Sequence, residues 1–255
     1  MNIGIIQGRL SPPVDGFQEC PENWIREFGL LDALGLSHID WIVTEGSFKS
    51  NPIFFEDVSG YSINSICADN LVNERTIFGE LESNLAPICN AAVRNNIKNI
   101  TIPLLEDSNV REERDRKTFI NLMLPIADTY KDLNFSFEAE LEAEKLLEIV
   151  DLRDNFFVTY DTGNITSCGY NHDKYINLVK HKIDNVHLKD RTFKAKSVPP
   201  LTGDTNFQLI FKTLQDMNYN GLYTLQTMRG QFGNEVDTIS EHKKLFEEIM
   251  NEQSI

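Results

Sequence analysis

Three residues of metal-binding types lie at the ends of three consecutive apolar segments. Glu138 ends segment 134–138, Asp161 directly follows segment 156–160, and His187 lies near the end of segment 184–188. Neighbouring parallel strands lie about 4.8 Å apart, so side chains at matching heights can converge on one ion. Each residue also has a structural alternative: a solvated carboxylate, a turn cap and a buried core histidine, respectively. Their occurrence in three successive segments nevertheless predicts a shared site.

The donor set favours a divalent cation. Two carboxylates and one imidazole suit Mn²⁺, Mg²⁺, Co²⁺ or Zn²⁺, and a set rich in oxygen favours the harder of these ions. Gln226 ends the last apolar segment, 222–226, and would add a neutral carbonyl oxygen. The sequence therefore predicts a metal site formed by Glu138, Asp161, His187 and Gln226.

These residues need strands to position them, and the chain alternates short apolar segments with amphipathic ones. The apolar segments are 2–6, 38–43, 62–67, 98–102, 134–138, 156–160, 184–188 and 222–226. Most are too short for helices and too continuously apolar for exposed hairpins, which is typical of parallel strands covered on both faces. Helical periodicity is present in 21–34, 111–132, 207–214 and 235–250. Pro52 and Gly60 predict an irregular stretch over 44–61.

Eight such units in 255 residues predict an α/β protein, a single (β/α)8 barrel spanning residues 1–255. A doubly wound open sheet is the alternative. It is disfavoured because the first strand continues into Gln7-Gly8-Arg9-Leu10 and not into a glycine-rich phosphate loop.

Catalytic residues of such barrels gather at the C-terminal ends of the strands. Besides the four residues of the predicted metal site, six polar residues there are expected to orient a substrate: Gln7, Arg9, Asp69, Asn164, Lys189 and Arg229. Asp40 lies near the end of the second segment, without a specific predicted role.

Positive charge gathers at the same end of the predicted barrel. Arg191, Lys194 and Lys196 follow Lys189, and the group could hold a phosphate or orient a substrate oxyanion. The alternative is a solvated loop over 189–196. Residues 203–206 precede a helix and could offer backbone N–H groups to an anion, but Asp204 or Thr205 as a helix cap is the favoured reading.

Composition excludes several classes of partner. The formal net charge of −15 disfavours nucleic acid and anionic membranes, which require a basic surface. No run of about 18 apolar residues is present, and residues 1–7 do not form a secretory signal. The four cysteines show no CxxC spacing, which is typical of reduced thiols in a cytoplasmic protein.

The chain resembles the sugar phosphate isomerase/epimerase family, the xylose-isomerase-like TIM barrels. The resemblance covers nearly the whole chain and is carried by short motifs: Gly4 to Pro12, Cys67-Ala68-Asp69, Phe137 to Glu140, Tyr160 to Asn164, Asn185 to Arg191, and Leu225 to Arg229. It implies a metal held by a glutamate, an aspartate, a histidine and a second glutamate. The first three match Glu138, Asp161 and His187, whereas the fourth position holds Gln226. A histidine frequent in the family is replaced by Asn164. A homodimer is a further expectation from the family.

The resemblance implies a metal-dependent isomerase or epimerase acting on a sugar or sugar phosphate through a metal-stabilised enediolate. Because Gln226 cannot exchange protons, Glu138 is expected to act as a single base, with Lys189 or another acid returning the proton. Alternatives are a metal-dependent lyase or dehydratase on the same barrel, and a non-catalytic sugar-binding member. An endonuclease of the same broad fold is disfavoured, since only one histidine lies at a strand end and the charge is −15.

Overall fold

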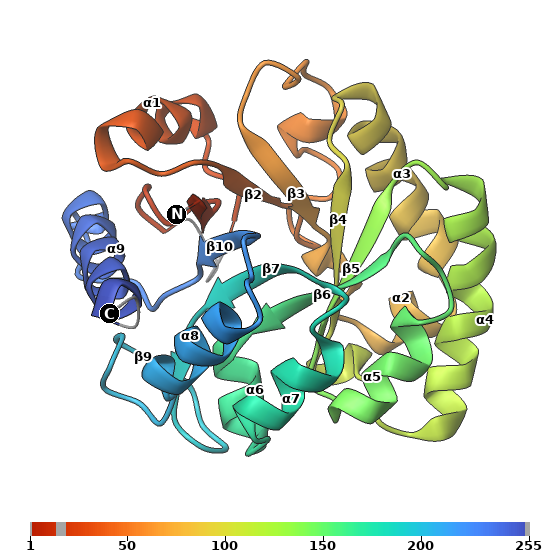
Figure 1. The fold of residues 1–255 in the computed structure, drawn as a ribbon. Coiled ribbons are helices and arrows are strands. Elements are labelled where there is room, and N and C mark those ends of the chain that lie inside the picture. Colours follow the sequence, from red (N-terminus) through yellow and green to blue (C-terminus); the bar gives the residue numbers. More distant parts are fainter. Residues whose placement is uncertain (1, 14–18, 253–255) are drawn as a thin grey trace.

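Eight parallel strands close into a barrel in the computed structural model, which describes residues 2–13 and 19–252 (Figure 1). The barrel strands are β1 (Asn2–Ile6), β2 (Ile39–Ile42), β3 (Ile63–Cys67), β4 (Asn99–Leu104), β5 (Asn134–Ala139), β6 (Phe156–Asp161), β7 (Ile183–Leu188) and β10 (Leu222–Leu225). Their order around the barrel is β1-β10-β7-β6-β5-β4-β3-β2. The predicted (β/α)8 barrel is confirmed, and each predicted apolar segment matches one of these strands to within two residues at either end. Residues 1, 14–18 and 253–255 of the predicted domain lie outside the described residues.

The helices cover the outside of the barrel (Figure 1). They are α1 (Trp24–Leu34), α2 (Glu74–Phe78), α3 (Leu81–Arg94), α4 (Glu113–Thr129), α5 (Ala143–Val150), α6 (Thr162–Cys168), α7 (His172–Val179), α8 (Phe207–Asp216) and α9 (Glu235–Glu252). Short 3₁₀ helices follow three strands: η1 (Pro52–Phe54), η2 (Asp69–Leu71) and η3 (Glu106–Ser108). As predicted, 44–61 contains no α-helix.

One small sheet lies outside the barrel and was not predicted. Strands β8 (Asp190–Arg191) and β9 (Ser197–Val198) pair antiparallel directly after β7. They form part of the long connection to α8, which carries the cationic residues of the predicted rim.

Aromatic side chains join the strands to the helices that cover them. Phe119 of α4 packs edge-on against Phe137 of β5 at 5.8 Å between ring centroids, and Phe137 meets Phe156 of β6 at 5.1 Å. On the opposite side, the ring centroids of Trp24 in α1 and Trp41 in β2 lie 5.1 Å apart. These buried contacts fix the strands that end in the predicted site.

The interior of the barrel contains polar side chains below the site. Gly4 of β1 pairs in register with Thr224 of β10, and a Cβ atom at Gly4 would lie 2.3 Å from the ring of His38. The absence of a side chain at Gly4 therefore makes room for the imidazole, whose Nε2 lies 3.0 Å from Oγ1 of Thr224. His38 is thus a buried structural residue.

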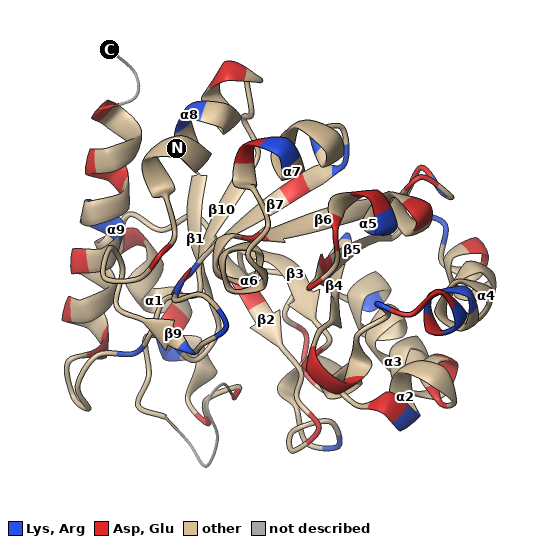
Figure 2. Cartoon of the chain, turned by 90° about the horizontal axis from the view of Figure 1, so that it is seen from below, with Lys and Arg blue, Asp and Glu red and all other residues tan. Residues whose placement is uncertain are grey.

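Charged residues lie mainly on the outer helices and loops, whereas the strands are mostly uncharged (Figure 2). None of the helices among the described residues is long and apolar enough to cross a membrane. All four cysteines are free thiols.

Candidate metal centre

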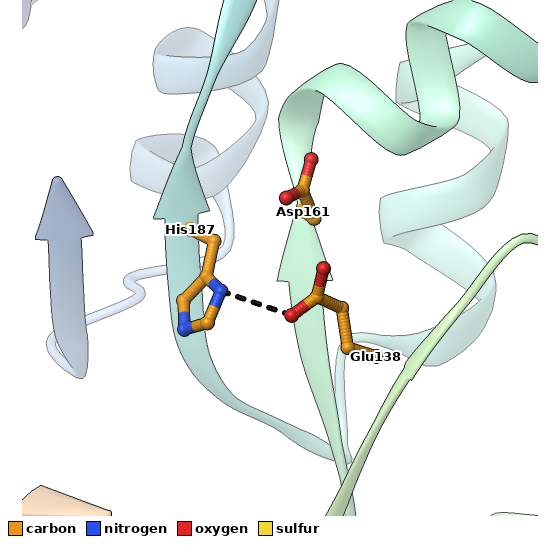
Figure 3. Close-up of side chains that lie close together, drawn as sticks. All are labelled: Glu138, Asp161 and His187. Atoms are coloured by element: carbon orange, nitrogen blue, oxygen red, sulfur yellow. Dashed lines mark ion pairs between the residues drawn. The ribbon is translucent and has the colours of Figure 1, made fainter. Parts of the chain in front are cut away.

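Glu138, Asp161 and His187 converge at the C-terminal ends of three adjacent strands, β5, β6 and β7 (Figure 3). One ligand atom from each lies within 4.8 Å of the others, and all three side chains are buried. The closest pair is Nδ1 of His187 and Oε2 of Glu138, at 3.2 Å. The sequence prediction that these three residues lie together is confirmed.

The donor atoms around this point lack hydrogen-bond partners. Oδ2 of Asp161, Nδ1 of His187 and Oε1 of Gln226 are buried atoms with no hydrogen bond. Buried polar atoms are normally satisfied, so a group of unsatisfied ones indicates a position for a bound ion. A cation bound between Asp161 and His187 would satisfy both of their atoms at once, so these residues fit a divalent metal ion.

Gln226 follows β10 and lies on the same side of the sheet as Thr224, because alternate residues of a strand share a face. Thr224 pairs in register with His187 and its hydroxyl points into the barrel. The backbone N–H of Gln226 donates to the carbonyl of Leu188 at 3.1 Å, which extends the β7–β10 pairing to this height. The side chain of Gln226 is accordingly placed on the inner face, one layer above His187.

The two carboxylate oxygens of Asp161 lie in different environments. Its Oδ1 accepts the backbone N–H of Asn164 at 2.7 Å and so caps α6. Its Oδ2 is left for the site and lies 3.6 Å from Nζ of Lys189. The cap fixes the carboxylate, and the second oxygen is free to bind a ligand.

Burial and neighbouring charges set the protonation of the three residues. Burial disfavours the charged form of Glu138, but the neighbouring imidazole of His187 lowers its pKa below the ordinary value. Burial raises the pKa of Asp161 to about 6, against the opposing charge of Lys189. Burial also lowers the pKa of His187, but Asp40 and Glu138 outweigh it and raise that pKa to about 10. Without a cation, His187 is therefore protonated at neutral pH.

The residues expected to orient a substrate fall into two groups. Asn164, Lys189 and Asp69 belong to the first group, around the three metal-type residues. The side-chain amide of Asn164 donates to Oε1 of Glu138 at 2.8 Å, and its carbonyl oxygen accepts from Arg191 at 2.9 Å. Burial, and then the charge of Glu138, raise the pKa of Asp69 to about 7, while Lys189 and Arg9 act in the opposite direction.

The second group lies on and against the loop after β1. Gln7 accepts the N–H of Ile42 at 3.1 Å, and its own amide nitrogen has no hydrogen bond. Arg229 donates to the carbonyl oxygens of Gly8 at 2.6 Å and Ser11 at 3.0 Å. Burial and the charge of Arg229 lower the pKa of Arg9 to about 9. Arg229 therefore holds the backbone of the loop that carries Arg9.

Two of the rim cations, Lys189 and Arg191, pair with carboxylates of the protein. Arg191 pairs with Glu140 at 3.3 Å. The backbone N–H groups of Gly203 and Thr205 donate to Asp190, at 2.9 Å and 3.3 Å. The N–H groups that could have bound an anion therefore bind the carboxylate of Asp190. The cap of α8 is Asn206, in place of the expected Asp204 or Thr205.

The position of Asp40 beside His187 was not predicted from the sequence. This fully buried carboxylate lies on β2, across the barrel interior, and its Oδ2 is 3.2 Å from Nε2 of His187. A carboxylate within the apolar run His38 to Val43 was the available signal, but the sequence does not show which side chain lies opposite.

Comparisons with known proteins agree with the fold. The sequence pattern of the family described as xylose isomerase-like TIM barrel matches residues 83–249. This range contains all four residues of the predicted metal site. No functionally curated protein matches the sequence.

Solved structures share the barrel over nearly its whole length. The IOLI protein with a bound zinc atom has a TM-score of 0.76 at 14% identity, covering 99% of both chains. A D-allulose 3-epimerase from Methylomonas sp. has a TM-score of 0.74 at 13% identity, covering 98% of both. The probable 3-DHS dehydratase AsbF from Bacillus anthracis has a TM-score of 0.71 at 12% identity, covering 97% of this chain and 99% of that one. At such identities the likeness establishes the fold.

Proposed function

Because the chain belongs to the xylose isomerase-like TIM-barrel family, we propose that it is a metal-dependent isomerase or epimerase of a sugar or sugar phosphate. The observation that carries the proposal is the convergence of Glu138, Asp161 and His187 within 4.8 Å, with unsatisfied donor atoms on Asp161 and His187. Solved barrels of the same fold include a zinc-bound protein and a sugar epimerase, which supports the reaction class.

In this proposal Glu138, Asp161, His187 and Gln226 hold a divalent ion such as Mn²⁺, Mg²⁺, Co²⁺ or Zn²⁺. When bound, the ion would supply positive charge to neutralise the substrate oxygens as a proton leaves the adjacent carbon. Side chains of the protein carry out every other step.

Glu138 is the proposed base. Its lowered pKa keeps it a carboxylate at neutral pH, so it can accept a proton from the carbon next to a substrate carbonyl. Asn164 holds one oxygen of this carboxylate at 2.8 Å, which restricts its orientation. Burial of the carboxylate excludes water, which would otherwise compete for the proton.

Lys189 is the proposed acid that returns the proton. Its ammonium group lies 3.6 Å from Asp161 and is mostly buried. Gln226 occupies the position where the family carries a second glutamate, and a carboxamide cannot exchange protons. Asp69 beside the site, and Gln7, Arg9 and Arg229 on and against the loop after β1, are proposed to orient the substrate hydroxyl or phosphate groups.

Solvent deuterium exchange tests the proposal. Protein loaded with manganese is incubated in deuterium oxide with a panel of ketoses, aldoses and their phosphates, and proton NMR follows loss of the signal next to the carbonyl. We expect exchange in at least one sugar, absent in Glu138→Gln. If the whole panel fails to exchange while the protein retains its metal, the isomerase proposal is wrong and sugar binding without turnover is favoured.

A dehydratase is the second candidate, and Gln226 is the observation that favours it. In an elimination of water, one carboxylate can remove the proton and then deliver it to the leaving hydroxyl group, so a single acid–base residue is sufficient. Epimerisation at one carbon instead uses two acid–base groups on opposite faces of the substrate. A probable dehydratase is also among the solved barrels of this fold. Mass spectrometry of the reaction products separates the two, since a dehydratase product has lost water and an isomerase product has the mass of its substrate.

Homodimer formation and a cytoplasmic location, expected from the family and from the composition, stay predictions. Sedimentation velocity would check the first, and fractionation of the source cells the second.

A further inference from the structure

We propose that Asp40 is a positioning residue for His187, which it orients so that Nδ1 faces the metal site with a free lone pair. This inference rests on the proposed metal site and names a residue of the chain outside the four proposed ligands.

The imidazole of His187 is held between two carboxylates. Its Nε2 lies 3.2 Å from Oδ2 of Asp40, and its Nδ1 lies 3.2 Å from Oε2 of Glu138. The side chains of His187 and Asp40 are both completely buried. Only one nitrogen of a neutral imidazole carries a proton, so the group that Nε2 contacts decides which nitrogen is free to bind a cation.

Asp40 accepts hydrogen bonds from several directions. Asn64 donates to Oδ1 at 2.8 Å, while Asn185 and Thr224 donate to Oδ2 at 2.9 Å and 2.8 Å. An ionised carboxylate only accepts hydrogen bonds, and this surrounding set consists of donors. His187 must therefore present a proton on Nε2 to Asp40, so a neutral ring in the metal-bound protein offers the lone pair of Nδ1 to the cation.

The hydrogen bonds behind Asp40 run in the same direction. The hydroxyl of Thr224 donates its single proton to Asp40. The same oxygen lies 3.0 Å from Nε2 of His38 and therefore accepts a hydrogen bond from that nitrogen. Nδ1 of His38 then accepts from the hydroxyl of Ser37 at 2.8 Å. The chain of donors from Ser37 to Asp40 is consistent with a carboxylate at its end.

The complete burial of the Asp40 carboxylate costs folding free energy. A fully buried carboxylate is destabilising without compensation by hydrogen bonds. Asp40 obtains its partners from β3, β7 and β10, at sequence separations of 24 to 184 residues. Carboxylates that orient a metal-bound histidine are a recurrent device, and their loss typically weakens metal binding about 10- to 100-fold.

Zinc affinity of Asp40→Asn tests the proposal, with Asp184→Asn as the matched control. Asp184 lies at the start of β7, on the same strand as His187, and accepts a hydrogen bond from Ser136 at 2.7 Å. Competition with a fluorescent chelator measures the affinity of each protein. We expect Asp40→Asn to bind zinc about 10- to 100-fold more weakly than the wild type. Asp184→Asn is expected to stay within about threefold.

The outcomes separate this inference from the proposed function. If the wild type binds zinc and Asp40→Asn binds equally well, the positioning role is wrong while the metal site stands. If the wild type binds no zinc, the metal site is wrong and the positioning role fails with it.

A spectroscopic measurement on the wild type remains decisive even if Asp40→Asn does not fold. Nitrogen-15 labelling of the five histidines allows the two ring nitrogens of His187 to be distinguished in the zinc-loaded protein. We expect the tautomer protonated at Nε2, with a slowly exchanging proton. A His187 ring protonated at Nδ1, or an Nε2 proton exchanging as fast as that of an exposed histidine, would overturn the proposal.

Discussion

The side-chain amide of Asn164 donates a hydrogen bond of 2.8 Å to Oε1 of Glu138, which leaves Oε2 facing His187. Asn164 is itself held by Arg191 at 2.9 Å. Glu138 is therefore oriented by the first helix after β6, although it belongs to β5.

Replacement of Asn164 by leucine removes this orientation at nearly constant volume. We expect manganese affinity to fall about tenfold, since Glu138 then loses the partner that fixes its free oxygen. Isothermal titration calorimetry measures the change. Asn177→Leu on the exposed surface of α7 is the control, and an equal effect of both variants would contradict the orienting role of Asn164.

Metal binding should strengthen as the pH rises. The pKa of His187 is raised to about 10, so between the pKa of Asp161 and this value a cation must displace one proton. Below about 6, the pKa of Asp161, a second proton must leave and the dependence becomes steeper. The apparent affinity is thus expected to rise about tenfold per pH unit near neutrality and more steeply in acid.

Calorimetry in buffers of different ionisation enthalpy counts the protons released. A release near one proton per ion at neutral pH agrees with His187 as a ligand that is protonated in the metal-free protein. Binding without proton release would mean that His187 is not a ligand.

Restoring the fourth carboxylate tests the position of Gln226. Gln226→Glu adds negative charge to the site, so we expect manganese affinity to rise about tenfold. The metal-free variant should melt at a lower temperature than the wild type, because another carboxylate then joins the buried acidic group. Scanning calorimetry with and without manganese measures both effects. If metal raises the melting temperature of both proteins equally, Gln226 does not face the ion.

The packing of the barrel interior at Gly4 leads to a stability prediction. An added Cβ would lie 2.3 Å from the ring of His38, so Gly4→Ala must displace the imidazole. We expect a loss of about 1–3 kcal/mol in the free energy of unfolding, measured by urea denaturation. At Gly29 in α1, by contrast, a Cβ meets no atom within 4 Å. Gly29→Ala should therefore stabilise the protein by about 0.5–1 kcal/mol, and the same sign for both variants would contradict the account.

The strands and the convergence of Glu138, Asp161 and His187 could be predicted from the sequence for one physical reason. Parallel strands buried on both faces need continuous apolar runs, and their carboxyl ends meet at one rim. The position of a residue at the end of its run therefore specifies its place in the molecule. The two-residue strands β8 and β9 carry no such periodicity and were not predicted.

Contacts across the barrel interior could not be predicted. Asp40 and His187 are 147 residues apart, and their contact depends on barrel closure and on which side chains point inward. The same holds for the rim cations, since the sequence places Arg191 after β7 but does not show its pairing with Glu140.

Metal content tests the central claim most directly. Wild-type protein and His187→Ala are stripped with a chelator, reloaded with manganese, passed through a desalting column and analysed by plasma mass spectrometry. The account predicts about one ion per chain in the wild type and little in the variant. No retained ion in either protein, or equal retention in both, would contradict a metal site formed by Glu138, Asp161 and His187.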